Sequence, residues 1–115
     1  MTAILFLAQR ASAAVLAFAV SVHLATILYA MRGGLTAGEV LARTRGNGWF
    51  LAFYFIFVVA VAVHAPIGLR NVLTEWTPWR GRSLDVALAL FALFLLVLGL
   101  RAAVAVYLPP EAMLR

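Results

Sequence analysis

Three apolar segments, each long enough to cross a lipid bilayer, constrain the fold of this chain more than any other feature of its sequence. They run over about residues 11–30, 49–69 and 84–108, and a membrane-spanning helix needs about 20 mostly apolar residues. The apolar fraction of the whole chain is 66%, whereas a soluble domain is about 45–50% apolar. The sequence therefore predicts an all-α integral membrane protein: one domain, residues 1–115, with three transmembrane helices that form part of a larger helical bundle.

The connections between these segments suit the membrane surface. Residues 31–48 are polar, contain glycine and are about long enough for a loop with one short interfacial helix. Residues 71–83 hold two tryptophans and two arginines, which are enriched in the headgroup region. After the third segment, Pro109 and Pro110 are expected to end the helix.

Charge and cysteine content exclude several classes of protein. The chain has nine Arg, no Lys, four acids and no Cys, for a formal net charge of +5. Because the arginines lie beside apolar runs, lipid phosphates are the expected contacts and a nucleic-acid partner is not. Without cysteine there is no disulfide, thiolate metal site or thiolate-held iron–sulfur cluster. Four arginines fall on each side of the membrane, so the positive-inside rule leaves the orientation open.

The chain has two histidines, and both fall inside predicted spans, His23 in the first and His64 in the second. An ionisable residue within a span usually faces the bundle interior and is a functional candidate. Two interpretations stay open for each: a neutral histidine hydrogen-bonded to a neighbouring helix, or an axial ligand of haem. A proton path is the least favoured, because neither of the first two spans contains a carboxylate.

The stretch AVAVHAPIGLR, residues 60–70, surrounds His64 with small residues. At ~100° per residue, His64 shares a helix face with Phe53, Phe57 and Gly68. Gly68 would leave room for a flat macrocycle, and the two phenylalanines would pack against its rim. Small residues also simply help membrane helices pack.

The depths of the two histidines bear on how many haems they would bind. His64 is six residues from Arg70, and His23 is thirteen residues past Arg10, with both arginines at the same side of the membrane. In antiparallel helices the difference is about seven residues, or ~10 Å. The pair therefore suits one ligand each for two stacked haems, with the opposite ligands from another chain or copy. A single haem on His64 is the simpler variant.

Two arginines and an acid lie at the rim of the spans. Arg10 and Arg70 are placed to pair with haem propionates, since guanidinium binds carboxylate bidentately. Arg10 would equally suit a quinone carbonyl, and both arginines would also reach lipid phosphates. Asp85, at the start of the third span, is expected to cap that helix or meet its dipole.

Two patches resemble the cytochrome b membrane-anchor subunit of succinate dehydrogenase and fumarate reductase (respiratory complex II). AQRASAAVLAF, residues 8–18, is similar to the His-Arg-x-Ser/Thr-Gly pattern of that family's first helix. HAPIGLRNVLTEW, residues 64–76, is similar to its His-x-x-x-Gly-[Ile/Leu]-Arg-His segment followed by an acid. The three-span layout of about 115 residues also fits.

The resemblance implies a role for six residues. Two match haem iron ligands: His64, the axial ligand of haem b, and His23, the further ligand of two-haem forms. Four match positions that contact haem propionates or quinone: Arg10, Ser12, Gly68 and Arg70. The family pattern is broken at four other positions, which puts the quinone site in question more than the haem: Phe6, Gln9, Ala13 and Asn71.

The function implied by the resemblance is electron transfer without catalysis by the chain itself. It would bind one or two b haems, shared with a partner chain, and pass electrons between an iron–sulfur subunit and ubiquinone or menaquinone. Its partners would be a second anchor subunit or second copy, the iron–sulfur subunit and an FAD flavoprotein. It would lie in the inner or cytoplasmic membrane with its N-terminus on the cytoplasmic side. The alternative is a haem-free structural subunit that holds other membrane chains together.

Overall fold

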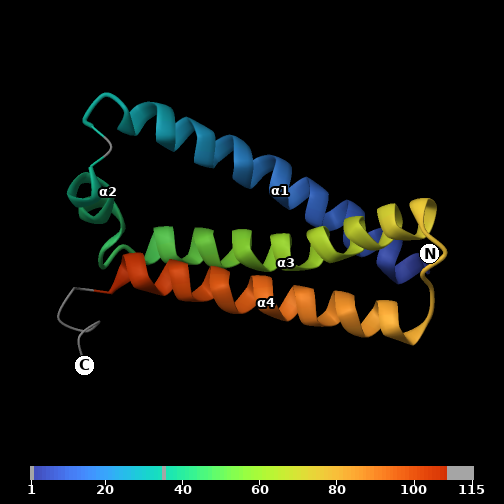
Figure 1. Cartoon of the computed structure of the whole chain (residues 1–115). Helices are drawn as coiled ribbons and strands as arrows, with labels where there is room; N and C mark the ends of the chain where they lie inside the picture. Colours follow the sequence, from blue (N-terminus) through green and yellow to red (C-terminus); the bar gives the residue numbers. More distant parts are fainter. Residues whose placement is uncertain (1, 35, 109–115) are drawn as a thin grey trace.

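The computed structural model describes residues 2–34 and 36–108, and this part of the chain is all-helical. Three long helices, α1 (Ala3–Ala30), α3 (Gly48–Trp76) and α4 (Arg82–Tyr107), are joined with one short helix, α2 (Ala37–Thr44) (Figure 1). Each long helix is long and apolar enough to cross a membrane. The prediction of three transmembrane helices and of a short helix in the first connection is confirmed.

The spanning helices extend beyond their apolar segments. α1 begins at Ala3 instead of near residue 11, and α3 continues to Trp76 instead of ending near residue 69. At the start of α1, the polar residues Gln9 and Arg10 interrupt an apolar run that begins at residue 3. At the end of α3, backbone hydrogen bonding continues through polar residues near the membrane surface. The predicted stop at Pro109 and Pro110 lies outside the described residues.

Short polar side chains set where the helices begin. The first N–H groups of a helix have no partner inside it. In α1, α2 and α3, such groups donate to the side chains of Thr2, Thr36 and Asn47, respectively. At the other end of α3, the Arg80 guanidinium donates to the carbonyl oxygen of Thr74. These contacts fix the helix ends at the two membrane surfaces.

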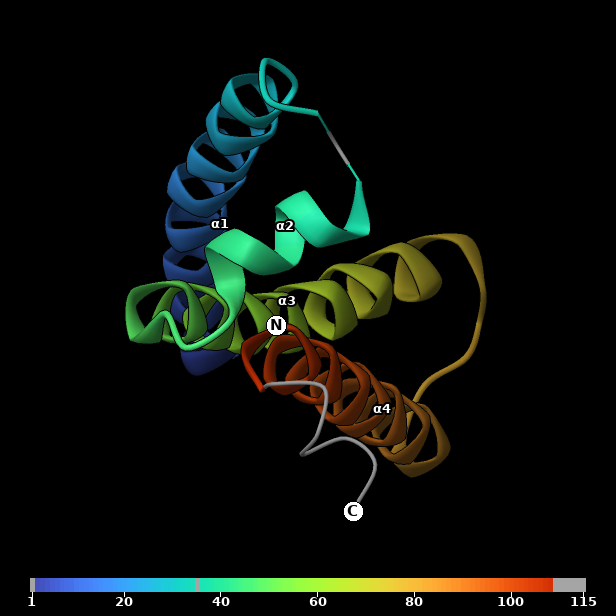
Figure 2. The same cartoon turned by 90° about the vertical axis from the view of Figure 1, so that its left-hand side faces the viewer.

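α3 is the central helix, and it packs against both α1 and α4 (Figures 1 and 2). From Gln9 to Ser12 the residue numbers rise along α1, while the residues that they contact on α3 fall from Gly68 to His64. Farther along, the His23 ring lies against Tyr54. α1 and α3 are therefore antiparallel, as the depth argument requires.

Gly99 allows α4 to approach α3 closely. A Cβ atom built at Gly99 would lie 2.5 Å from Cγ1 and 2.8 Å from Cγ2 of Val58. Separations below about 3 Å are hard-sphere overlaps, so only a residue without a side chain fits at this point. Leu84, Leu88 and Ala103 are the buried residues of α4.

Two hydrogen bonds join the end of α2 to the end of α4. Thr44 is only 6% exposed, and its hydroxyl donates to the carbonyl oxygen of Val106 at 2.8 Å. The Gly46 N–H donates to the carbonyl oxygen of Tyr107 at 3.0 Å. The last carbonyl groups of a helix have no partner within it, so the segment after α2 supplies partners for two of them.

Thr44→Val is expected to loosen this connection without changing the size of the side chain. The variant leaves the Val106 carbonyl without its donor, a loss of about 1 kcal/mol. Hydrogen–deuterium exchange is expected to speed up in α2 and at the end of α4. Thr74→Val is the matched control, because among the described residues the Thr74 hydroxyl bonds only within its own helix, to the carbonyl oxygen of Asn71. Equal exchange in the two variants would contradict the prediction.

Candidate functional site

His64 meets Ser12 across the interface between α3 and α1. Ser12 Oγ lies 3.4 Å from His64 Nδ1, and the same hydroxyl donates to the Gln9 carbonyl oxygen at 3.1 Å. Since a hydroxyl has one hydrogen, a Ser12 hydroxyl that donates to Gln9 can only accept from His64 Nδ1–H. The lone pair of the imidazole is then on Nε2. This is how histidines that bind metals are usually oriented, with the other ring nitrogen donating to a neighbouring oxygen.

The Gln9 side chain lies over Gly68, one turn beyond His64. A Cβ built at Gly68 would be 3.4 Å from Gln9 Nε2, an ordinary packing distance. The amide therefore occupies the space beside Gly68 in which a macrocycle was expected. Gln9 Oε1 is buried and has no hydrogen-bond partner among the described residues. An unpaired buried polar atom costs about 1–3 kcal/mol, so this oxygen is an acceptor available to a further group near His64.

His23 lies at another level of the same interface. Its ring contacts Tyr54 and Phe57 edge to face, with centroids 5.9 and 5.8 Å away. His23 is eleven residues past Ser12, or ~16 Å along α1 at 1.5 Å per residue. This separation is larger than the ~10 Å expected from the sequence, because His64 lies at the level of Ser12. The two imidazoles therefore do not face one another at one depth. Phe53 also joins the aromatic cluster, through its contact with Phe57.

The cavities at the two levels differ in size and lining. A groove of about 380 Å³ between α1 and α3 is almost wholly apolar and is lined by Ser12, Ala60 and Val63 among others. A cavity of about 140 Å³ lies at His23, with Arg43 and Tyr54 in its wall. Cofactor and ligand pockets usually measure about 300–1,000 Å³. The groove at the level of Ser12 is within that range, although His64 is not among its lining residues, and the cavity at His23 is below it.

The two rim arginines lie away from the Ser12–His64 contact. Arg10 is exposed, and its guanidinium lies over the Phe6 ring, 5.6 Å from the centroid. Arg70 Nη2 lies 3.4 Å from Asp85 Oδ1 on α4. The structure therefore brings together Ser12, His64 and Gly68, and places the other predicted site residues elsewhere.

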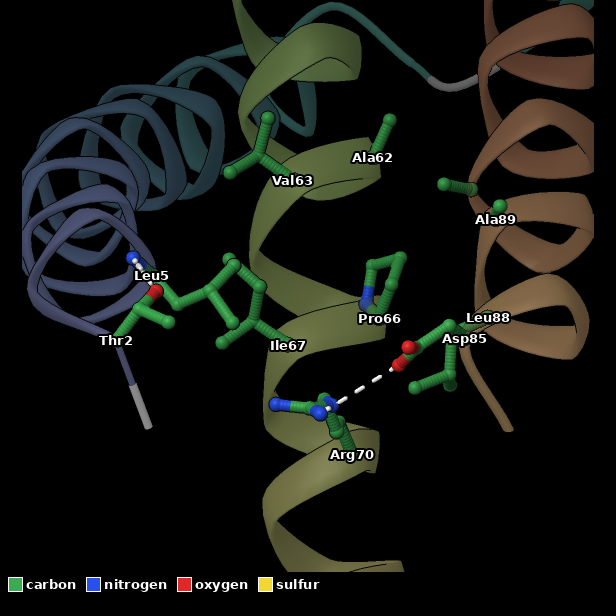
Figure 3. A pocket seen from close by; sticks show the side chains of 11 residues that line it. Thr2, Leu5, Ala62, Val63, Pro66, Ile67, Arg70, Asp85, Leu88 and Ala89 are labelled. Atoms are coloured by element: carbon green, nitrogen blue, oxygen red, sulfur yellow. Dashed lines mark hydrogen bonds and ion pairs between the residues drawn. The ribbon is translucent and has the colours of Figure 1, made fainter. Parts of the chain in front are cut away.

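A third cavity, of about 530 Å³, lies between α1, α3 and α4 (Figure 3). Its lining is mainly apolar, and the ion pair of Arg70 with Asp85 lies in its wall. Asp85 is in the first turn of α4, where the helix dipole favours a carboxylate, as predicted. Sequence reasoning missed its ion pair with Arg70, although both residues lie close to the short connection that joins α3 and α4.

Comparison with known proteins gives the family of the chain. A search of curated proteins returned no match, and a search of solved structures returned none either. The family model of the succinate dehydrogenase/fumarate reductase transmembrane subunit matches residues 1–100, which include all six predicted site residues. With its three membrane-spanning helices, the chain is a multi-pass membrane protein that belongs to the succinate dehydrogenase/fumarate reductase transmembrane subunit family and serves as a membrane anchor of such a complex.

Proposed function

We propose that the chain binds haem b through His64 and, with partner chains, carries electrons between an iron–sulfur subunit and membrane quinone. The contact between Ser12 Oγ and His64 Nδ1 is the observation that carries this proposal. It joins two spans at one point and favours the tautomer in which Nε2 is free to bind iron. Membership of the family supports the partners and the quinone.

The roles of the residues follow from their positions. His64 would bind the haem iron through Nε2, and Ser12 would restrict rotation of the ring by accepting from Nδ1–H. The apolar groove beside them would keep water away from the site. Haem would supply one-electron oxidation and reduction at its iron, while the protein sets ligation, orientation and electrostatics. Arg10 would hold a carboxylate or carbonyl group at the membrane surface, whereas the Arg70 guanidinium is paired with Asp85 on α4.

Partner chains complete this proposal. A further iron ligand would come from a second anchor subunit or a second copy of this chain, and His23 would serve a further haem only together with such a partner. The iron–sulfur and FAD subunits would dock on the cytoplasmic side, near the N-terminus, and ubiquinone or menaquinone would accept or donate electrons there.

A haem-free structural subunit is the second candidate. The edge-to-face packing of His23 on Tyr54 and Phe57 favours it for that residue, because the ring is held by neighbouring side chains. In this case the His64–Ser12 contact would be an interhelical hydrogen bond that holds α1 to α3, of the kind common between membrane helices.

A dithionite-reduced minus oxidised spectrum of the detergent-purified complex tests the proposal, with haem measured per copy of this chain. A b-type α-band with about one haem per chain is expected for a single site whose second ligand comes from a partner. A complex with all its subunits and no such band would leave the structural-subunit function in its place.

Ser12→Ala is expected to weaken haem binding about 10–100-fold, the usual cost of losing the hydrogen bond that orients a metal-binding histidine. Competitive transfer of haem to a soluble acceptor protein measures this loss. Ser21→Ala is the matched control, because Ser21 is exposed on the same helix and, within residues 2–34 and 36–108, its hydroxyl bonds only to the Ala17 carbonyl oxygen. A similar loss in both variants would show that the Ser12 contact has no special role.

A further inference from the structure

Arg70, which follows His64 on α3, forms an ion pair with Asp85, so the negative charge of Asp85 offsets the positive charge of Arg70. Arg70 Nη2 and Asp85 Oδ1 are 3.4 Å apart, and Figure 3 shows the guanidinium reaching from α3 toward the carboxylate on α4. The Arg70 side chain is 32% exposed and the Asp85 side chain 61%. The pair is therefore partly screened by water on the Asp85 side, while the arginine is held deeper.

Arg70 is near enough to His64 for its charge to affect a redox group there. The two residues are six positions apart on α3, or ~9 Å along the helix axis at 1.5 Å per residue. A full charge at this distance still interacts with another charge at the effective dielectric constant of about 20 that is typical near a protein surface. Because reduction of a haem adds an electron, an uncompensated Arg70 would favour the reduced form. An ionised Asp85 beside Arg70 would oppose that effect.

The position of Asp85 at the start of α4 suits a carboxylate side chain. It lies in the first turn of α4, where the helix dipole stabilises a negative charge. Arg70 Nε is buried without a hydrogen-bond partner among the described residues, so the guanidinium is held on this side mainly by its contact with Asp85. Without Asp85, the guanidinium is free to turn within the cavity of about 530 Å³ that both residues line.

We propose that Asp85 is a positioning residue, which holds Arg70 toward α4, offsets its charge and thereby lowers the reduction potential of the haem bound at His64. The proposal rests on the proposed function, because it requires a haem at His64. Asp85 would thus help to set the driving force of electron transfer, although α4, the helix that carries it, holds none of the predicted iron ligands.

A redox titration of the intact complex, followed at the b-type α-band, tests this role. Asp85→Asn is expected to raise the midpoint potential, by as much as a tenfold change in the reduced-to-oxidised ratio at a fixed ambient potential, or about 59 mV for one electron. Glu75→Gln is the matched control. Glu75 is an exposed acid near the end of α3, and it makes no ion pair within residues 2–34 and 36–108. Its replacement is expected to leave the potential unchanged.

Two further variants separate charge from structural damage. The double variant Arg70→Gln/Asp85→Asn is expected to return the potential toward that of the wild type, because both charges are removed. Arg70→Gln alone leaves Asp85 uncompensated and is expected to lower the potential, a test that does not depend on assembly of Asp85→Asn.

The outcomes distinguish this inference from the proposed function. A wild-type complex without a b-type band would overturn the proposed function itself. A haem-loaded complex whose potential is the same in the wild type, Asp85→Asn and Arg70→Gln would overturn only the role of Asp85. An equal rise in Glu75→Gln would do so too, since it would show a general effect of surface charge.

Discussion

Replacing His64 by alanine is expected to remove the b-type α-band from the purified complex, with haem per copy of this chain falling to background. Loss of a hydrogen bond to a metal-binding histidine already costs about 10–100-fold in affinity, so loss of the ligand itself should cost more. The partner's ligand alone would leave the iron with an open position. Pyridine haemochrome analysis of the complex, purified through a partner subunit, measures the result.

His23→Ala is the comparison that gives the His64 result its meaning. If each histidine holds its own haem, this variant loses part of the band and retains the remainder. If His23 is a packing residue among Tyr54 and Phe57, the spectrum is unchanged while thermal stability falls. A complex that keeps its full band after His64→Ala would instead make AVAVHAPIGLR a packing element, and the electron-transfer role would have to be abandoned.

Gly99→Leu is expected to disrupt the packing of α4 on α3 and to lower the yield of assembled complex sharply. Even a single added carbon would lie 2.5 Å from Val58 Cγ1. Val58 cannot turn away easily, because a valine in a helix strongly prefers one rotamer. Overpacking of this kind costs about 1–3 kcal/mol for small additions, and a leucine adds several carbons at once. Size-exclusion chromatography and thermal inactivation of the detergent-purified complex measure the effect.

A second-site change provides the sharper test of this contact. Gly99→Ala alone should be destabilising despite the higher helix propensity of alanine, worth about 1 kcal/mol. Combining it with Val58→Ala removes both Cγ atoms and should restore much of the stability. Gly38→Ala is the control, since a Cβ at Gly38 would meet nothing within 4 Å. Destabilisation that Val58→Ala fails to relieve would place the cause outside the Gly99–Val58 contact.

The number and order of the membrane helices follow from hydropathy, but their ends do not. Segments of about 20 apolar residues identify the spans because the bilayer sets a minimum length. α1 and α3 nevertheless extend beyond those segments, to Ala3 and Trp76. α1 continues past the polar residues Gln9 and Arg10, and α3 continues through the polar stretch that follows residue 69. Capping by Thr2 and Asn47 sets where those two helices begin, and a hydropathy average does not register such single residues.

At the site, the sequence pattern predicts which residues share a helix face, but it does not predict which residues of two helices meet. Periodicity placed His64 and Gly68 on one face of the second span, and in the structure both lie against α1. The pairing of Ser12 with His64 depends on the register between two helices, which no local pattern encodes. The same is true of Gln9, whose amide lies over Gly68. The ion pair of Arg70 with Asp85 was not predicted, because Arg70 was assigned to haem propionates or lipid phosphates and Asp85 to the start of its own helix.

The hydrogen bond from Thr44 to Val106 has a consequence for how the chain is made. Its two ends are 62 residues apart in the sequence, and a ribosome adds roughly 5–20 residues per second. The nascent chain therefore waits roughly 3–12 s after Thr44 is synthesised before Val106 exists. Both partners of the Ser12–His64 contact are translated within that interval or before it. The first two spans are therefore synthesised before the third, and Thr44 gains its hydrogen bond to Val106 only after the third span has been made.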